Sequence, residues 1–566
     1  MAFCTQCGKE IADERLLCDE CMEKNETEET ISEESETPEF FLPPKKTANT
    51  RDLILAALLI LPCFLLINSL FWGGVGLGIT VSTLLIAVIS FWYVAFEKKG
   101  KSSLYVVILS TLLILSSLSL TFSDEGITKG FSVVAILLLY MVILTEYFGA
   151  RTHKAGTFKA FADVMRTAFE YGLGKIPDGT FALFRKTDEE GNITKRRTGN
   201  ILTGIVVAVP VLFIVVPLLI SSDAAFEGLF KNLSFGNIWE LIVTICFGIL
   251  YFLAVFSRLF TMKDMDTPEG KESTFKGLEP ISICSFLGAV SAAYVIYLFS
   301  QLAYFFSAFR GLLPEDFTVA EYARRGFFEM CAVCAINLFI MFMTCVLCRK
   351  NESGLPKSVK TLNVFLGFFS IVLIVTAISK MVLYIDSFGM TRLRIYTSVF
   401  MIVLGIIFFT VILKLFISEI PYMKVILITA CSVLLITCLV DADRVIATYN
   451  VDAYLSGKLD SVDVSTLEEL DSSAIEPLLR LYREDDGQAG KNAQKALIKR
   501  LKVHFEIIQN QNGAYTIKRK NFDIRNLNLP EQLAIKSLEE NWQDFFDYDI
   551  YSGRTDEINY SHTFLY

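Results

Sequence analysis

Long uninterrupted apolar runs dominate the pattern of hydrophobic and polar positions, and they recur from Leu53 to Val440. Each run holds roughly 18–25 residues, enough for a helix to cross a hydrocarbon core of about 30 Å at a rise of about 1.5 Å per residue. We therefore predict an all-α, polytopic membrane protein with about eleven transmembrane helices. The predicted limits are 53–70, 75–96, 104–122, 130–149, 200–220, 239–260, 281–303, 326–348, 361–385, 396–418 and 424–440.

The segments outside these runs divide the chain into four predicted parts: residues 1–22, 23–50, 51–440 and 441–566. The first is cysteine-rich, and the second carries eight glutamates between Glu23 and Glu39. Such an acidic segment holds too few apolar side chains to offset its ordering entropy, so we predict a disordered linker. In the last part, "STLEELDSSAIEPLLRLYRE" and "KNAQKALIKRLKVHFEIIQ" have helical spacing, and "GAYTIKRKNF" suggests a hairpin arm. We expect a soluble, mostly helical tail.

Composition and charge support the membrane assignment and orient it. Hydrophobic residues make up 53% of the chain, and the predicted inner loops hold 25 lysines and arginines against 7 in the outer loops. Because Lys and Arg favour the cytoplasmic side, we predict a cytoplasmic N-terminus in the bacterial cell membrane, without a cleavable signal peptide. An odd number of spans then places the tail outside the cytoplasm. The lipid bilayer is the expected environment, and no nucleic-acid partner is predicted.

Four cysteines at the start have the spacing of a small zinc ribbon. Cys4 and Cys7 form one Cys-x2-Cys pair, ten residues follow, and Cys18 and Cys21 form the second pair. Zinc takes four thiolates at about 2.3 Å, and two short knuckles close around one ion. A reducing cytoplasm keeps the thiols free for metal. We predict a closed, structural Zn²⁺ site without which the module unfolds, with disulfides or idle cysteines as the alternative.

A second cysteine quartet has the same spacing but lies inside an apolar run. It consists of Cys331, Cys334, Cys345 and Cys348. On one helix the first and third cysteines are about 21 Å apart along the axis, which is too far for a single ion. All four fall on one helical stripe, where small polarizable residues let neighbouring membrane helices approach closely. We predict helix packing, with a thiol redox or metal role as the alternative.

Charged residues gather near the predicted outer ends of several spans. They are Asp223, Glu321, Arg324, Arg325, Glu329, Lys380, Asp386, Arg392, Arg394, Asp441, Asp443 and Arg444. Ionisable groups at membrane depth are costly and become functional hypotheses by default. One interpretation is a polar cluster that binds a substrate or a lipid headgroup, in which arginine side chains contact a phosphate group. The other is ion pairing that fastens helix ends, with arginines reaching to the headgroups; in either case Arg325 and Glu329 are spaced to pair.

The basic stretch 151–200 contains apolar residues with helical spacing. They are Phe158, Phe161, Val164, Met165, Phe169 and Leu173. This pattern predicts a helix lying on the anionic inner leaflet, with a partner-binding or packed loop as the alternative. Pro210 and Pro217 predict a kinked fifth span.

Catalytic motifs are absent from the sequence. The chain has three histidines, all outside the predicted spans, and it contains no HExxH, complete P-loop or G-x-S-x-G pattern. We therefore predict a protein that is not an enzyme, with no catalytic and no organic-cofactor residues.

Three stretches, "FTVAEYARRGFFE", "GMTRLRIYT" and "DADRVIATYNVDAYL", carry a family resemblance. They resemble a family of bacterial polytopic membrane proteins, the domain-of-unknown-function family four thousand one hundred and seventy-three, over residues 200–480. The most specific part is Glu321–Phe328. The resemblance implies an integral membrane location and no assigned reaction. The N-terminus is similar to the zinc ribbons attached to many bacterial membrane proteins.

Two functional hypotheses follow from these patterns. The first is a non-enzymatic envelope sensor or scaffold, whose zinc ribbon binds a cytoplasmic protein partner while the tail faces the cell wall. The alternative is a transporter or lipid-handling protein that uses the outer Arg/Glu cluster. The sequence predicts no particular oligomeric state.

Overall fold

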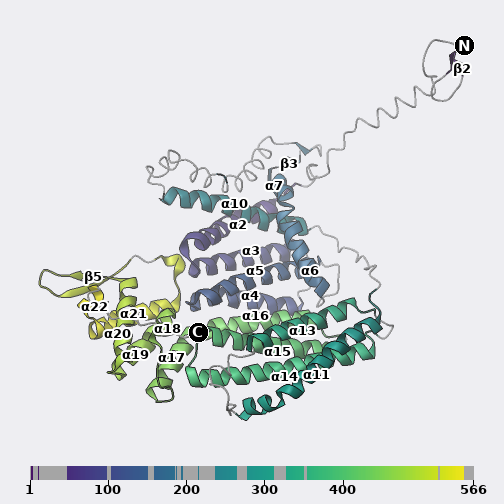
Figure 1. The fold of residues 1–566 in the computed structure, drawn as a ribbon. Coiled ribbons are helices and arrows are strands. Elements are labelled where there is room, and N and C mark those ends of the chain that lie inside the picture. The colour runs from purple at the N-terminus through teal and green to yellow at the C-terminus, as the bar shows by residue number, and fades with distance from the viewer. Residues whose placement is uncertain are drawn as a thin grey trace.

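Most of the chain is described by a computed structural model. The described residues are 2–3, 10–11, 47–97, 103–150, 158–184, 186–187, 193–194, 215, 236–263, 277–310, 327–349, 354–417, 419–520 and 523–552. They form mostly α-helices, as predicted, together with three two-stranded antiparallel sheets. Long helices lie side by side, and smaller helices gather at one end of them (Figure 1).

Ten helices among the described residues are long and apolar enough to cross a membrane. They are α2 (Thr50–Asn68) with its π-helical continuation η2 (Ser69–Gly73), α3 (Leu77–Glu97), α4 (Leu104–Phe122), α5 (Gly126–Phe148), α10 (Gly236–Met262), α11 (Pro280–Arg310), α13 (Phe327–Leu347), α14 (Lys357–Phe388), α15 (Arg392–Phe416) and α16 (Tyr422–Val440). Each coincides with a predicted apolar run. The remaining predicted run, 200–220, lies outside the described residues apart from Val215, and so do both of its prolines.

The first bundle consists of α2, α3, α4, α5 and α10. Helix α10 packs along α2, and α4 packs along α5. Leu55, Leu59, Phe256 and Leu259 are fully buried at the contact between α2 and α10. A helix satisfies its own backbone hydrogen bonds, so its apolar side chains are free to face either lipid or a neighbouring helix.

The second bundle consists of α11, α13, α14 and α15, and α14 packs on the other three. Buried polar groups join its helices: Tyr294 donates to Asn337 Oδ1 at 2.6 Å, and Asn337 donates to Ser370 Oγ at 2.9 Å. Such interhelical hydrogen bonds add direction to otherwise non-directional apolar packing. Helix α16 packs on α15 as well as on α4 and α5, so it joins the two bundles.

The C-terminal domain, residues 442–552, has a hydrophobic core of its own. Its elements are α17 (Ala442–Leu455), α18 (Val464–Glu469), η4 (Ser472–Ala474), α19 (Ile475–Glu484), α20 (Gln488–His504), β5 (Phe505–Gln509), β6 (Tyr515–Arg519), η5 (Ile524–Asn526), α21 (Leu529–Phe545) and α22 (Tyr548–Ser552). Leu478, Leu481, Leu497 and Phe505 are buried at its centre. The predicted tail helices and hairpin arm are therefore present, with β5 and β6 pairing from Phe505 to Arg519.

A short helical cap covers one end of the first bundle. It comprises α6 (Phe158–Thr167), η3 (Ala168–Leu173) and α7 (Ile176–Phe184), and a small sheet follows in β3 (Lys186–Thr187) and β4 (Ile193–Thr194). The predicted amphipathic helix is present, but its apolar residues are divided. Val164 is buried against the bundle, whereas Phe169 and Leu173 are exposed.

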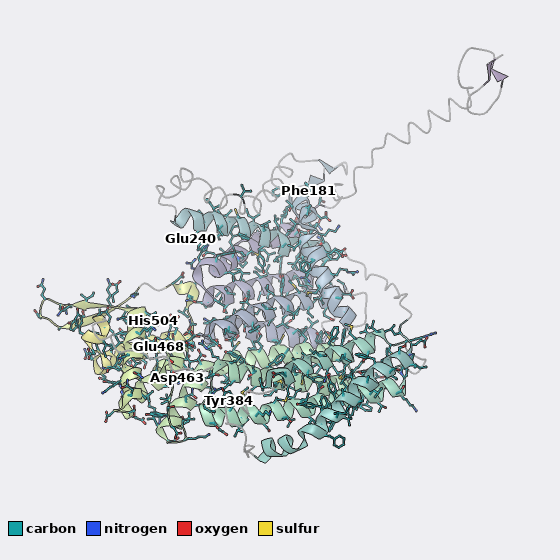
Figure 2. The ribbon with its side chains drawn as sticks, in the orientation of Figure 1. Phe181, Glu240, Tyr384, Asp463, Glu468 and His504 are labelled. Atoms are coloured by element: carbon teal, nitrogen blue, oxygen red, sulfur yellow. The ribbon has the colours of Figure 1, made fainter. Side chains whose placement is uncertain are left out.

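The turns between helices define two ends of the bundles. Turns 74–76, 123–125 and 389–391, together with Asp441, lie at the end that the C-terminal domain covers, which we call the docking face. Near this face lie also Glu240, at the start of α10, and Tyr384, near the end of α14 (Figure 2). The other end, where α2 begins and α10 ends, is called the opposite face.

A buried ion pair holds the opposite face of the first bundle. Lys263, directly after α10, donates to Asp52 Oδ1 and Oδ2 at 2.8 and 2.7 Å. Asp52 is fully buried in the first turn of α2, where it also accepts hydrogen bonds from Tyr93 Oη at 2.6 Å and Asn49 N at 2.8 Å. The pair fastens the start of α2 to the end of α10.

Replacing Asp52 by Asn should destabilise the first bundle strongly. Removing one partner leaves the Lys263 ammonium buried and uncompensated, which costs about 3–5 kcal/mol. The thermal midpoint of the purified protein in detergent measures this loss. Adding Lys263→Met should restore most of the midpoint, because the introduced amide oxygen still accepts from Tyr93. An equally low midpoint in the double variant would contradict the ion-pair explanation.

Candidate functional site

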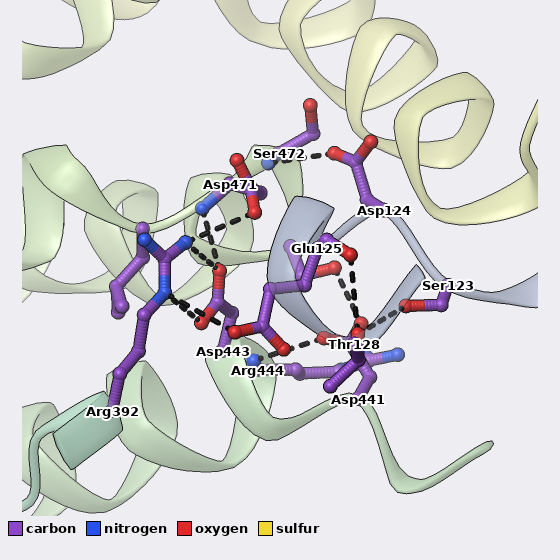
Figure 3. A network of polar contacts seen from close by, with 12 residues as sticks. Ser123, Asp124, Glu125, Thr128, Arg392, Asp441, Asp443, Arg444, Asp471 and Ser472 are labelled. Atoms are coloured by element: carbon purple, nitrogen blue, oxygen red, sulfur yellow. Dashed lines mark hydrogen bonds and ion pairs between the residues drawn. The ribbon is translucent and has the colours of Figure 1, made fainter. Parts of the chain in front are cut away.

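Arg392 is the centre of a polar network where the C-terminal domain meets the docking face (Figure 3). It is the first residue of α15, and Thr391 caps this helix by accepting from the Arg394 N–H. The Arg392 guanidinium donates from Nε to Asp443 Oδ1 at 2.7 Å and from Nη2 to Asp471 Oδ2 at 2.9 Å. Nη2 also contacts Asp443 Oδ2, so the pair with Asp443 is bidentate. One side chain thus joins α15, α17 and the segment before η4.

Two aspartates connect the last membrane helix to the C-terminal domain. Asp443 is fully buried in α17 and also accepts from the backbone N–H of Asp471 at 2.8 Å. Asp441 has a φ of 54°, a left-handed conformation that aspartate tolerates because its short side chain bonds to nearby backbone. Its carboxylate accepts from Arg444 N at 3.3 Å and from the Ser473 hydroxyl. The chain therefore turns directly from α16 into the domain that it helps to hold.

The turn between α4 and α5 supplies two more carboxylates. Asp124 Oδ2 accepts from the Ser472 N–H at 3.0 Å. Glu125 is buried, and its Oε1 lies 3.7 Å from Arg392 Nε. Both bundles therefore contact the same short segment of the C-terminal domain, Asp124 from the first bundle and Arg392 from the second. We call Asp124, Glu125, Arg392, Asp441, Asp443 and Asp471 the Arg392 junction.

A glycine-rich turn forms a second contact with the C-terminal domain. Residues 73–78 read "GGVGLG", and the Leu77 N–H donates to Leu527 O at 3.1 Å. A Cβ added at Gly76 would lie 2.7 Å from the backbone carbonyl carbon of Asn526. The docked backbone thus passes too close for any side chain at position 76, and glycine is required there.

Arg525 extends the contact at the glycine-rich turn onto the end of α2. Its Nη1 donates to Asn68 Oδ1, and Asp523 accepts from its Nε at 2.9 Å. Asn68 and Trp72 in turn donate to Thr244 Oγ1 of α10 at 3.3 and 3.2 Å. Through η5 the C-terminal domain therefore contacts α2 with η2 and α3, and Asn68 and Trp72 connect this contact to α10.

A third contact lies at the turn between α14 and α15. Asn450 of α17 accepts from Met390 N at 2.6 Å and donates to Met390 O at 2.9 Å. Asp386 pairs with Lys458 at 2.8 Å and accepts from Tyr449 Oη at 3.2 Å. These bonds hold α17 along the end of the second bundle.

The predicted polar cluster is only partly assembled. Arg392 joins Asp443 and Asp441 in the junction, but Asp386 faces Lys458 in the separate third contact. Arg394 donates to Phe388 O at 3.0 Å, with its guanidinium 4.0 Å from the ring centre of Tyr384. Arg444 pairs with Glu476 at the surface, and Glu329 is exposed in α13. Asp223, Glu321, Arg324 and Arg325 lie outside the described residues, which leaves the Arg325–Glu329 pair a prediction.

Sequence reasoning missed three junction residues, Asp124, Glu125 and Asp471. The first two lie in the short connection between the predicted runs 104–122 and 130–149, and an Asp-Glu pair in such a connection was a usable signal. Asp471 gave no such signal, because it lies in an ordinary polar stretch of the tail. The glycine-rich turn was also overlooked, although its glycine density indicates close backbone approach.

Burial raises the pKa of three carboxyl groups in the junction. The pKa of Asp471 rises to about 7, because burial and the neighbouring charges of Asp443 and Asp124 outweigh the attraction of Arg392. The pKa values of Glu125 and Asp441 are also raised, chiefly by burial. The junction thus brings more carboxylates together than one guanidinium neutralises, and protonation relieves the excess.

The two cysteine quartets differ in what the structure shows about metal binding. Cys4, Cys7, Cys18 and Cys21 lie outside the described residues, although Phe3 and Glu10 pair between β1 (Ala2–Phe3) and β2 (Glu10–Ile11). In the second quartet, Cys331 Sγ contacts Met401 Sδ at 3.4 Å and Cys334 Sγ faces Ser370 O at 3.8 Å. These contacts match the predicted packing role. Within the described ranges, no group of three His, Cys, Asp or Glu side chains is arranged to hold a metal ion.

The fold and junction define a class of protein: a multi-pass helical membrane protein whose soluble domain is docked on the ends of its own helices. Comparison with protein families matches residues 108–481 to a domain of unknown function, DUF4153. The chain belongs to this family. The sequence motifs resemble a differently numbered family, four thousand one hundred and seventy-three. The comparison does not show that the chain belongs to that second family. Neither the curated proteins nor the solved structures contain a match.

Replacing Arg392 by Met should loosen the C-terminal domain. Asp443 would remain buried without its partner, a loss of about 3–5 kcal/mol. Hydrogen exchange of residues 442–484 should become faster in the full-length protein. The matched control is Arg444→Met, whose exposed pair with Glu476 contributes about 0–1 kcal/mol. Equal exchange in the two variants would contradict a central role for Arg392.

Docking should weaken as the pH rises from about 4, the ordinary pKa of an aspartate, to about 7. An acid whose pKa is raised in the docked state binds its proton more tightly there, so docking is strongest when Asp471 is protonated. This advantage falls progressively across the range and is gone once the pH passes about 7. Protease sensitivity of the intact domain, measured across this range, reports the effect. Asp471→Asn should flatten the profile, and an unchanged slope in that variant would rule out Asp471 as the titrating group.

Proposed function

We propose that this protein is a non-enzymatic scaffold or sensor of the bacterial cell membrane that couples its C-terminal domain to its membrane bundles. The observation that carries the proposal is the Arg392 junction, in which residues of both bundles hold one segment of the domain. A change in docking must alter contacts to α4–α5 and α15 together. Such an element, with one docked and one loosened arrangement, is what a sensor requires.

The excess of carboxylates supports a responsive rather than a permanent contact. Glu125, Asp443 and Asp471 all face the one guanidinium of Arg392. Their protonation state changes how firmly the domain is held. A substrate site at the same arginine has less support, because Arg392 is already engaged by Asp443 and Asp471.

The proposed orientation keeps the N-terminus in the cytoplasm and the C-terminal domain outside. Helices α5 and α10 support an eleventh crossing, since both run from the docking face to the opposite face. Glu240, near the start of α10, interacts electrostatically with Arg525 at the docking face. Lys263, directly after the end of α10, pairs with Asp52 at the opposite face. A chain that leaves α5 at the opposite face must return to the docking face before α10. The apolar run 200–220 is long enough to provide that return.

We further propose that residues 1–22 form the predicted zinc ribbon and bind a cytoplasmic protein partner. The antiparallel pairing of Phe3 with Glu10 supports this, because it brings together the two ends of the stretch that holds Cys4 and Cys7. All four ligands would be thiolates, so the metal would supply stability and no chemistry. An acidic linker of roughly thirty residues would let the ribbon reach a partner away from the membrane.

The orientation is tested by labelling intact cells with a membrane-impermeant maleimide. Asp460→Cys introduces a thiol at an exposed site of the C-terminal domain, and Lys357→Cys introduces one at the exposed start of α14 on the opposite face. We expect Asp460→Cys to be labelled in intact cells and Lys357→Cys only after permeabilisation, each above the wild-type background. The reverse pattern would overturn the orientation.

The coupling is tested by photo-crosslinking from the ribbon in living cells. We expect a specific partner to be captured by the wild-type chain, lost in Cys4→Ser/Cys7→Ser and altered in yield by Arg392→Met, with membrane insertion intact in every case. Arg444→Met serves as the matched control and should behave as wild type. The proposal would be refuted if the crosslinking yield of the partner were the same in the wild type, in Cys4→Ser/Cys7→Ser and in Arg392→Met.

A further inference from the structure

A buried arginine lies near the opposite face of the first bundle. Arg258 falls within the predicted span 239–260, and the structure places it inside α10, five residues before Lys263. Its side chain is turned inward, and the residue is only 5% exposed. It therefore does not reach the headgroups as an arginine at a helix end usually does.

The Arg258 guanidinium has no carboxylate partner among the described residues. Nη2 makes both of its hydrogen bonds, to Met141 O at 3.0 Å and to Thr145 Oγ1 at 3.2 Å, and both acceptors are neutral. Nε is buried without a hydrogen-bond partner in the described part of the chain. Lys263 and Arg392, by contrast, each contact an aspartate.

This arrangement is unfavourable for the empty protein. A charge taken out of water needs a countercharge or a full set of hydrogen bonds, and Arg258 has neither. Arginine cannot escape the cost by losing its proton, because its solution pKa is far above physiological pH. A membrane-buried ionisable group of this kind points to a ligand of opposite charge.

The helical cap of α6, η3 and α7 packs close to Arg258 at the opposite face. The Thr145 hydroxyl that accepts from Arg258 also bonds to Thr167 Oγ1 of α6 at 3.0 Å. On the preceding residue of α10, Ser257 donates to Ile176 O at 3.4 Å. A Cβ at Gly179 of α7 would lie 2.9 Å from Ser257 Cα, so α7 approaches α10 closely here. Arg258 thus lies beneath a lid of separate short helices.

We propose that Arg258 forms a binding site for a phosphate group at the opposite face of the first bundle, covered by residues 158–184. A guanidinium matches phosphate oxygens with charge-assisted hydrogen bonds, and Nε is an available donor for one of them. The hydroxyls of Thr145 and Thr167 lie next to it, but they already donate to Met141 O and Val164 O, so the guanidinium itself supplies the donors. The phosphate comes from a free anion or from a lipid headgroup. This site is separate from the Arg392 junction and does not depend on the proposed function.

Equilibrium dialysis of the full-length purified protein against radiolabelled inorganic phosphate tests the free anion. Retention of phosphatidylglycerol over phosphatidylcholine, measured by native mass spectrometry after extraction from mixed vesicles, tests the headgroup. In at least one of these assays, the wild-type protein should bind about one equivalent of phosphate or of phosphatidylglycerol. Arg258→Met should weaken that binding about tenfold or more, because it removes the charge and the donors. Arg349→Met is the matched control, since Arg349 is an exposed arginine at the same face and pairs with Glu279; it should bind as wild type.

Thermal stability without phosphate provides an independent reading. If the charge is there for a ligand, Arg258→Met should unfold at the same temperature as the wild type or higher, because it removes an uncompensated charge. Binding in neither assay would overturn the proposal. So would equal binding by wild type and Arg258→Met, or a clearly lower midpoint of Arg258→Met without phosphate, which would make the arginine a structural tie to Met141 and Thr145.

Discussion

The bidentate pair of the half-buried Arg392 with the buried Asp443 is the interaction on which the relative placement of the three parts depends. Arg392 begins α15 of the second bundle, Asp443 begins the C-terminal domain, and the same guanidinium faces Glu125 from the first bundle. Packing between apolar helices is non-directional and tolerates sliding. A bidentate charged pair does not, because its two parallel hydrogen bonds require one relative orientation of the partners. The junction therefore adds a fixed register to the one that interhelical hydrogen bonds such as Asn337–Ser370 provide within a bundle.

Directional contacts are concentrated at the two ends of the bundles for a physical reason. Between the ends, lipid and apolar side chains are nearly equivalent surroundings, so burial there distinguishes one arrangement from another only weakly. At the opposite face, Asp52 and Lys263 hold α2 to α10, and at the docking face Asp124 and Arg392 hold one segment from two sides. Under the proposed sensor function, a change at either face would act through these end contacts.

The membrane architecture could be predicted because one property, the length of an apolar run, determines it. The limits differ mainly where charged residues extend a helix: α14 includes Lys357 and Asp386, beyond the predicted run 361–385. The site could be predicted only in part. Arg392 and Asp443 stand out beside apolar runs, but Asp124 and Ser472 are 348 residues apart in sequence, and no local pattern encodes their contact. Arg258 lies near the end of the predicted span 239–260, but no local pattern shows that its side chain turns inward instead of reaching the headgroups.

Buried charges in this chain fall into two kinds, and the difference separates structure from function. Lys263 and Arg392 are compensated by aspartates, so their burial contributes specificity at moderate cost. Arg258 and the excess carboxylates of the Arg392 junction are not compensated, and their burial lowers stability. A chain under selection for folding alone would replace such groups with apolar ones. Local violations of packing rules are expected where a protein binds or responds, so the two proposals rest on Arg258 and on the excess carboxylates rather than on the paired Lys263.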